Sequence, residues 1–223
     1  MRAETIQLLS IILVSIIIGF SQYKNSKRPY RLLLFLLITT FLAETLAEYC
    51  AHAFRNNLFV YHFFHPVEYT LLALIFYNLI ESNSFKKFIL FSVALYTPLS
   101  VWNSLYLERF AEYKINTTAI LVESILLVMF ALQVLLEFLK KPFYENIYSQ
   151  PSFWISLGVL IFFSTNIFFW GYYSRLANNA EGVQLFYKIL FYENLVLYFL
   201  FGVALVLVRI QNSSRVKNTK HFQ

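Results

Sequence analysis

The chain has 223 residues, of which 59% are hydrophobic and 13% are charged, and its formal net charge is +6. A soluble domain carries about a quarter charged residues, so this composition excludes an ordinary soluble enzyme or binding domain. The sequence has no aspartate and a single cysteine. These counts exclude an intrachain disulfide and a metal held by a cluster of cysteine thiolates.

Seven apolar stretches follow one another along the chain, and each reaches the ~20 residues that a helix needs to cross a bilayer. They predict helices at residues 5–22, 32–53, 58–80, 86–106, 116–139, 153–174 and 183–208. The first stretch lacks the small-residue cleavage site of a signal peptide, so we count it as a helix. Runs such as 121–130 are continuously apolar, whereas the strands of a membrane barrel alternate every second residue. The sequence therefore predicts an all-α, polytopic membrane protein with a seven-helix transmembrane domain over residues 1–209 and a basic tail over residues 210–223.

The lysines and arginines are distributed unevenly between the connecting segments. Twelve of the 18 follow the first, third, fifth and seventh stretches: Lys24, Lys27, Arg28, Arg31, Lys86, Lys87, Lys140, Lys141, Arg209, Arg215, Lys217 and Lys220. Five lie at the other ends of the stretches: Arg2, Arg55, Arg109, Lys114 and Arg175. Because basic loops stay in the cytoplasm, we predict a plasma (inner) membrane protein with its N-terminus outside and its C-terminus in the cytoplasm. The charges are dispersed over four cytoplasmic segments, which indicates contact with membrane lipids and argues against nucleic-acid binding.

Polar side chains within the predicted helices gather in the outer half of the bundle. Twelve of them form the predicted ligand-binding set: Glu44, Glu48, Tyr61, His62, His65, Glu68, Tyr69, Glu123, Asn166, Lys188, Glu193 and Asn194. A charged side chain at the centre of a membrane helix costs about 2.5–3.5 kcal/mol, so such residues usually face the bundle interior or a water-filled cavity. The cytoplasmic halves carry apolar runs such as 32–37 and 71–76. We therefore predict a cavity that opens outward above an apolar plug; the alternative is a dry bundle whose polar groups hydrogen-bond between helices.

The predicted helix at 58–80 concentrates these groups on one face. At ~100° per residue, Glu68, Tyr61, His65, Tyr69 and His62 fall at about −20°, 0°, 40°, 80° and 100° around its axis. Imidazole and carboxylate are ligands that suit zinc or a similar ion, so His62, His65 and Glu68 could hold a divalent metal. Their His-x-x-His-x-x-Glu spacing matches no recognised metal motif.

Lys188 lies inside the predicted helix at 183–208, and it either pairs with a buried glutamate or extends to the membrane interface. Microbial rhodopsins share the seven helices and a lysine in the last one. Here Lys188 lies near the start of its helix, and the helix at 58–80 lacks the arginine and aspartate of a retinal counter-ion complex. Retinal is therefore disfavoured as a cofactor. Alkaline-ceramidase-type and lysoplasmalogenase-like membrane enzymes rely on an aspartate. Because this sequence contains no aspartate, both enzyme classes are excluded.

The segment 61–69 (YHFFHPVEY), the chain length and the Ile-, Leu- and Phe-rich composition resemble a loose group of small uncharacterised seven-helix bacterial inner-membrane proteins. The chain also looks like the membrane sensing regions of some histidine kinases. We expect a receptor- or sensor-like protein that binds a small ligand or cation and contacts a separate signalling partner at the cytoplasmic side. The alternatives are a small proton- or cation-coupled transporter and a metal-dependent membrane enzyme that uses His62, His65 and glutamates.

Overall fold

The computed structural model describes residues 3–112, 114–140, 146–176 and 180–220, and within these ranges the secondary structure is entirely helical. The seven helices are α1 (Ala3–Phe20), α2 (Arg28–Phe54), α3 (Leu58–Leu79), α4 (Asn83–Tyr106), α5 (Thr117–Leu139), α6 (Pro151–Leu176) and α7 (Ala180–Lys220). Short 3-10 turns occupy three connections: η1 (Tyr23–Asn25), η2 (Phe110–Glu112) and η3 (Ile147–Ser149). All seven helices are long and apolar enough to cross a membrane, so the prediction of an all-α chain with seven helices of membrane-spanning length is confirmed.

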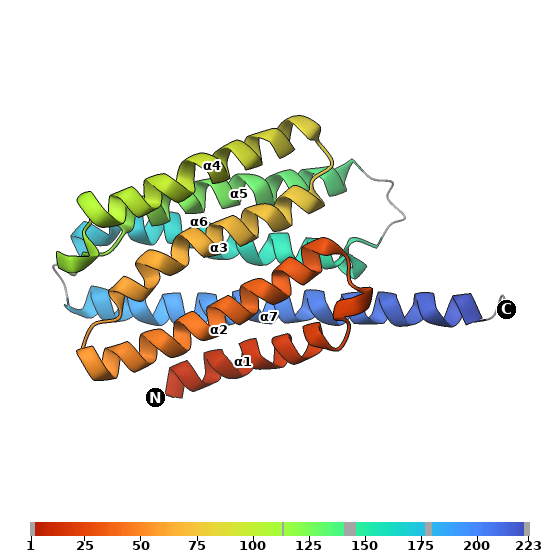
Figure 1. Cartoon of the computed structure of the whole chain (residues 1–223), viewed down its shortest axis with the longest axis horizontal. Helices are drawn as coiled ribbons and strands as arrows, with labels where there is room; N and C mark the ends of the chain where they lie inside the picture. Colours follow the sequence, from red (N-terminus) through yellow and green to blue (C-terminus); the bar gives the residue numbers. More distant parts are fainter. Residues whose placement is uncertain (1–2, 113, 141–145, 177–179, 221–223) are drawn as a thin grey trace.

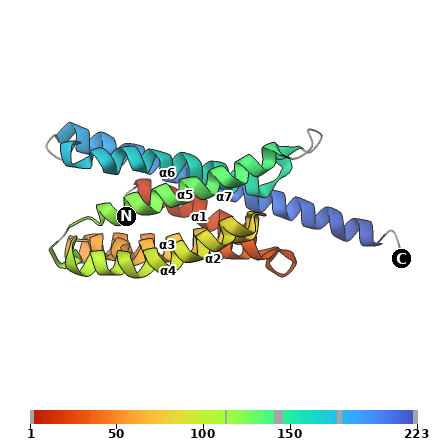
Figure 2. The ribbon, with the colours of Figure 1, turned by 90° about the horizontal axis from the view of Figure 1, so that it is seen from above.

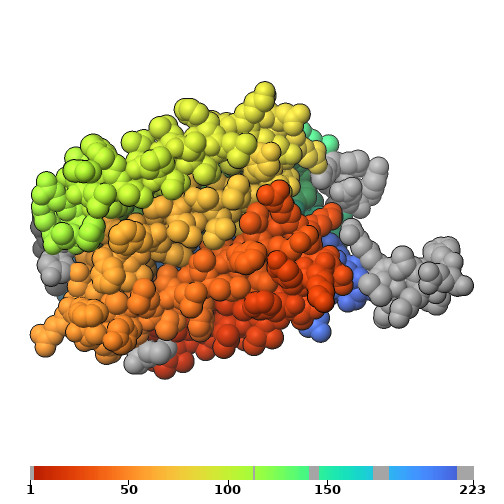
Figure 3. All heavy atoms as spheres, viewed as in Figure 1, coloured from red at the N-terminus to blue at the C-terminus, as the bar shows by residue number. Residues whose placement is uncertain are grey.

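The helices form two layers, α2 to α4 in front and α5 to α7 behind in the view of Figure 1, and α1 packs against both α2 and α7. Figure 3 shows that the first four helices together cover one continuous face. Packing between the layers closes a ring of six helices in the order α1, α2, α3, α5, α6 and α7, in which α7 returns to α1. The remaining helix, α4, packs on the outer side of this ring, mainly against α3. The ring positions six helices around a common interior, and α4 supports it from outside.

Local sequence signals explain where the helices begin. Pro29 and Pro151 occupy the first turns of α2 and α6, where a missing backbone N–H is tolerated. The Ser82 hydroxyl accepts a hydrogen bond from the Phe85 amide at 3.4 Å and caps α4. Because caps and polar first turns lie beyond the apolar runs, most helix ends differ from the predicted ones by up to four residues.

The end of α7 differs most, because the helix continues to Lys220 instead of stopping at residue 208. Two serine hydroxyls bond back to the preceding turn, Ser213 to the Arg209 carbonyl and Ser214 to the Ile210 carbonyl. Neither glycine nor proline interrupts this polar stretch, so nothing in the sequence stops the helix. Figure 1 shows α7 projecting past the other helices at the C-terminal end of the molecule.

The half of the bundle at that C-terminal end, which we call the apolar half, is tightly packed with aliphatic and aromatic side chains. Its buried residues include Leu33, Leu37, Leu72, Phe76, Phe130, Val134, Ile155, Val159, Phe201 and Leu205. Close approach of the first and last helices depends on Gly202, since a Cβ there would lie 2.8 Å from the Ser15 hydroxyl oxygen. Large apolar side chains such as Phe91, Phe168 and Phe199 are exposed on the outside of the bundle, as lipid-facing residues are.

The opposite half, which carries the N-terminus, is more open, and we call it the polar half. Figure 2 shows α2, α3 and α4 diverging from α6 and α7 toward this end. The starts of α1, α3, α5 and α7 and the ends of α2 and α6 meet there.

Candidate functional site

A cavity of about 400 Å³ lies inside the helix ring in the polar half. All six ring helices contribute side chains to its wall, and α4 contributes none among the described residues. Its lining includes five glutamates and two histidines: Glu4, Glu44, Glu48, Glu68, Glu123, His62 and His65. No lysine or arginine lines it within the part of the chain that the structure describes. The cavity is therefore a strongly acidic environment.

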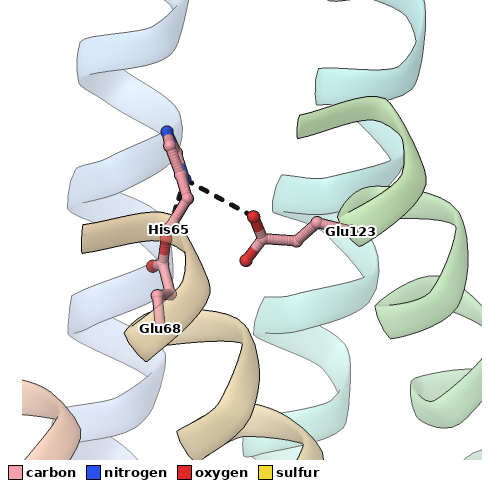
Figure 4. A group of neighbouring side chains, drawn as sticks. All are labelled: His65, Glu68 and Glu123. Carbon is pink, nitrogen blue, oxygen red and sulfur yellow. Dashed lines mark ion pairs between the residues drawn. The ribbon is translucent and has the colours of Figure 1, made fainter. Parts of the chain in front are cut away.

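The centre of the site is a cluster of His65 and Glu68 from α3 and Glu123 from α5. The Nδ1 atom of His65 lies 3.4 Å from Oε2 of Glu123 and 3.6 Å from Oε2 of Glu68. Figure 4 shows both carboxylates directed at this ring nitrogen, one from its own helix and one from across the bundle. The Glu123 side chain is 1% exposed, that of Glu68 is 9% and that of His65 is 19%. The packing of α3 against α5 thus buries three potential metal ligands together.

A tyrosine on the outer helix holds one of these carboxylates in place. The Tyr96 hydroxyl of α4 donates to Oε2 of Glu123 at 3.1 Å and also approaches the Ala119 carbonyl at 3.3 Å. The other oxygen of Glu123, Oε1, is buried and has no hydrogen-bond partner in the structure, and neither has Nδ1 of His65. Buried polar atoms are nearly always satisfied, so these two atoms indicate a place for a ligand, an ion or water.

A second pair of carboxylates lies on α2, one helical turn apart. Glu44 accepts a hydrogen bond from the Tyr61 hydroxyl at 3.3 Å, and Glu48 accepts one from the Thr5 hydroxyl at 3.2 Å. Glu44 is close enough to Glu68 and Glu48 to interact with both electrostatically. Carboxylates from α2, α3 and α5 therefore line the same cavity.

The polar arc predicted on α3 divides in two when the helices pack. Tyr61, His65 and Glu68, on one side of the arc, face the cavity. The two members on its other side, His62 and Tyr69, turn toward α4 and contact serines there. Tyr69 donates to Oγ of Ser92 at 2.6 Å and is fully buried, so it does not line the cavity. Nδ1 of His62 lies 2.9 Å from Oγ of Ser104, although one edge of His62 still reaches the cavity wall.

His62 also fastens the connection between α4 and α5. Its Nε2 atom lies 2.8 Å from the Lys114 carbonyl, which can only accept, so Nε2 carries a proton. Asn116 donates to the same serine hydroxyl as His62 contacts, at 2.8 Å. Both ring nitrogens of His62 are committed to these contacts. Among the described residues, the side chains that come together as potential metal ligands are His65, Glu68 and Glu123, whereas the predicted set was His62, His65 and Glu68.

Charged residues on this connection are paired with one another at the surface. Glu112 contacts Lys114 at 2.6 Å and Arg109 at 3.1 Å. The Lys114 ammonium beside it holds the pKa of the Glu112 carboxyl below its usual value. The basic residues of this segment are thus held outside the acidic cavity.

Helical spacing explains which of the predicted α7 residues reach the cavity. Tyr187, Leu190, Phe191, Asn194 and Tyr198 line it and fall within an arc of about 100°. Lys188 and Glu193 lie outside this arc, on either side of it. Lys188 is exposed, and Glu193 is half-buried beside Thr165 of α6. These two predicted site residues are therefore separate from the cavity.

Asn166 is the predicted site residue of α6, and it lines the cavity as a buried side chain. Its amide is bonded within its own helix, donating to the Phe162 carbonyl at 2.9 Å and accepting from the Trp170 indole at 2.8 Å. Trp170 also lines the cavity but was not in the predicted set, and neither were Glu4 and Thr5 of α1. The position of Glu4 and Thr5 in the cavity wall could have been inferred, because the predicted topology places them at the same membrane face as Glu48.

The cavity ends above the apolar half. Tyr198 lies at its inner end, and both Tyr198 and the Leu72 of α3 are buried. Beyond them come Phe76 and Phe130, with ring centroids 6.2 Å apart, and Phe201, all fully buried. The described interior thus changes from carboxylates to close-packed apolar side chains along the same helices.

No protein-family model matches this chain, and searches of curated proteins and of solved structures also find no match. The function therefore has to be inferred from the site itself.

Proposed function

We propose that this protein is a receptor-like binding protein of the plasma (inner) membrane whose cavity opens to the outside and takes a small cationic ligand. The proposed orientation rests on the distribution of lysine and arginine, which places the N-terminus, and with it the polar half, at the outer face. The cavity would then be reached from outside the cell.

The acidity of the cavity is the observation that carries the proposal. Five glutamates line a cavity of about 400 Å³, and no described lysine or arginine offsets them there. Buried charges are stable only when they are paired or when they bind a cation. A positively charged ligand would supply the missing counter-charge, whereas an anionic ligand would be repelled.

The size and the walls of the cavity suit a small molecule. Ligand pockets have volumes of ~300–1,000 Å³ and are lined by apolar and aromatic groups with a few polar ones. Opposite the carboxylates, α6 and α7 present Trp170, Tyr187, Phe191 and Tyr198. Aromatic faces attract cations, which adds to the preference for a positively charged group.

The closed inner end favours a binding protein over a transporter. A proton- or cation-coupled transporter needs a second arrangement in which the cavity opens to the other side. The fully buried Leu72, Phe76 and Phe130 would all have to separate for that opening. A metal-dependent enzyme is the other alternative, and the cluster around His65 is the observation that favours it.

A receptor also needs a route to a partner in the cytoplasm. The last helix, α7, lines the cavity near Tyr187 and continues to Lys220 at the opposite end. We infer that this single helix carries a change at the cavity to the basic C-terminal tail. The tail would meet anionic lipids or a separate signalling protein there.

Ligand-dependent stabilisation of the purified protein tests this proposal. Organic ammonium compounds and metal cations would be screened for a shift in melting temperature, since a ligand present at ~100 times its Kd stabilises the native state by about 2.7 kcal/mol. We expect a cation to raise the melting temperature and Glu68→Gln to abolish that shift while the protein stays folded.

The control is Glu137→Gln, which removes a carboxylate of α5 outside the cavity. It should leave the shift intact. If the shift survives in full in both Glu68→Gln and His65→Ala, the ligand binds elsewhere and the proposal is wrong.

A further inference from the structure

The cluster of His65, Glu68 and Glu123 in the cavity wall has the donor atoms of a transition-metal site. We propose that His65, Glu68 and Glu123 bind one divalent first-row metal ion of the zinc type, with an open coordination position toward the cavity. This inference rests on the proposed function, because the metal would be the cation that the acidic cavity takes up.

The distances from His65 to the two carboxylates match those between ligands that share a metal. Zinc–nitrogen and zinc–oxygen bonds are ~2.0–2.2 Å long, so the edge of a tetrahedron around zinc is about 3.3–3.6 Å. Nδ1 of His65 lies 3.4 Å and 3.6 Å from the two carboxylate oxygens. A direct charge-assisted hydrogen bond between the same groups would be shorter, at about 2.7–2.9 Å.

The unsatisfied atoms of the cluster support the same conclusion. Nδ1 of His65 and Oε1 of Glu123 are buried without a hydrogen-bond partner in the structure. The Glu123 side chain is 1% exposed, so solvent at the surface does not satisfy it. A metal bound between the groups would use the lone pair of Nδ1 and the carboxylate oxygens together. Two carboxylates and a divalent ion are also neutral in sum.

The surroundings of Glu123 resemble the support that metal ligands usually have. Ligating carboxylates are commonly oriented by a further hydrogen bond from a neighbouring group. Here the Tyr96 hydroxyl donates to Glu123 from α4, a helix that does not line the cavity within the described residues. Tyr96 is a positioning residue in this arrangement, because it acts through Glu123 and does not contact the metal.

Three protein ligands leave at least one coordination position for water or a ligand. Structural zinc sites are closed by four protein ligands, whereas sites with three keep an exchangeable position. All three side chains line the cavity, so this position faces its interior. The site is thus suited to reversible metal binding or to a metal that holds a further ligand.

Direct metal binding by the purified protein tests the inference. The purified protein, treated with a chelator and then dialysed, would be titrated with Zn²⁺ and separately with Co²⁺, whose visible absorption reports tetrahedral coordination. We expect one ion per chain and a tetrahedral cobalt spectrum. Tyr96→Phe should weaken binding about tenfold, and His65→Ala and Glu123→Gln should each weaken it more than that.

Two matched controls separate this site from adventitious binding. His52→Ala removes an exposed histidine at the end of α2 that lies in the polar half. Glu137→Gln removes a glutamate of α5 outside the cavity. Both should bind metal as the unmodified protein does. Glu123→Gln keeps the side-chain volume and the contact with Tyr96, and monodispersity in size-exclusion chromatography would verify folding of each variant.

The outcomes distinguish this inference from the proposed function. Full metal affinity in both His65→Ala and Glu123→Gln, or an equal loss in His52→Ala, would overturn the metal site. If organic cations stabilise the protein through Glu68 while Zn²⁺ and Co²⁺ do not bind, the metal site is wrong and the cation-binding cavity stands. If neither metal nor organic cation binds, both are wrong.

Discussion

The two halves of the bundle are built from the same helices but differ in how their interiors are filled. On α3, the polar half presents His65 and Glu68 to the interior, and the apolar half presents Leu72 and Phe76 two turns later. The same change occurs on α5, from Glu123 to Phe130. The apolar half is filled by close-packed side chains, whereas the polar half encloses a cavity of about 400 Å³.

This difference indicates what each half contributes. Helices in a membrane associate mainly through packing, because lipid tails are as apolar as leucine. The fully buried side chains of the apolar half provide that packing. The polar half leaves ionisable atoms of His65 and Glu123 unsatisfied, an arrangement that lowers stability unless something binds there. We therefore assign stability to the apolar half and binding to the polar half.

The largest expected effect is a loss of stability when a large buried side chain of the apolar half is replaced by alanine. Phe76 is fully buried against Phe130, so Phe76→Ala should lower the free energy of unfolding by about 3 kcal/mol. Glu44→Gln keeps the side-chain volume and the contact with Tyr61 in the polar half, and we expect a change below about 1 kcal/mol. Unfolding in detergent would measure both. A larger loss in Glu44→Gln than in Phe76→Ala would contradict this division.

A smaller effect is expected where His62 fastens the connection between α4 and α5. His62→Ala removes the contacts with Ser104 and the Lys114 carbonyl, and we expect a loss of about 1–2 kcal/mol. Because the effect is local, amide hydrogen exchange at Ile115 and Asn116 should accelerate. His52→Ala, which changes an exposed histidine, should leave that exchange unchanged. If these amides exchange equally fast in the unmodified protein, His62→Ala and His52→Ala, then His62 does not hold the connection between α4 and α5.

The fold followed from the sequence because its strongest signal is the length of each apolar run. Seven runs predicted seven helices, and only their ends were misplaced, since caps and polar turns such as Ser82 and 210–220 lie outside the runs. The membrane orientation depends on charge counts and is still a prediction.

The candidate site was less accessible to sequence reasoning. Periodicity placed Tyr61, His62, His65, Glu68 and Tyr69 on one face of α3, but it could not show where that face divides between the cavity and α4. Such a division depends on which helices are neighbours in the ring. For the same reason, no sequence spacing could connect Glu123 of α5 with two residues of α3.

Access of water from outside tests the central claim most directly. In a Cys50→Ser background, Asn194→Cys would place a thiol on the cavity wall and Leu72→Cys would place one in the apolar half. On intact cells, a small membrane-impermeant thiol reagent should label Asn194→Cys and not Leu72→Cys, while both should be labelled after denaturation. Inertness of both on intact cells, or labelling of Asn194→Cys only in inverted vesicles, would contradict a wet cavity that opens outward.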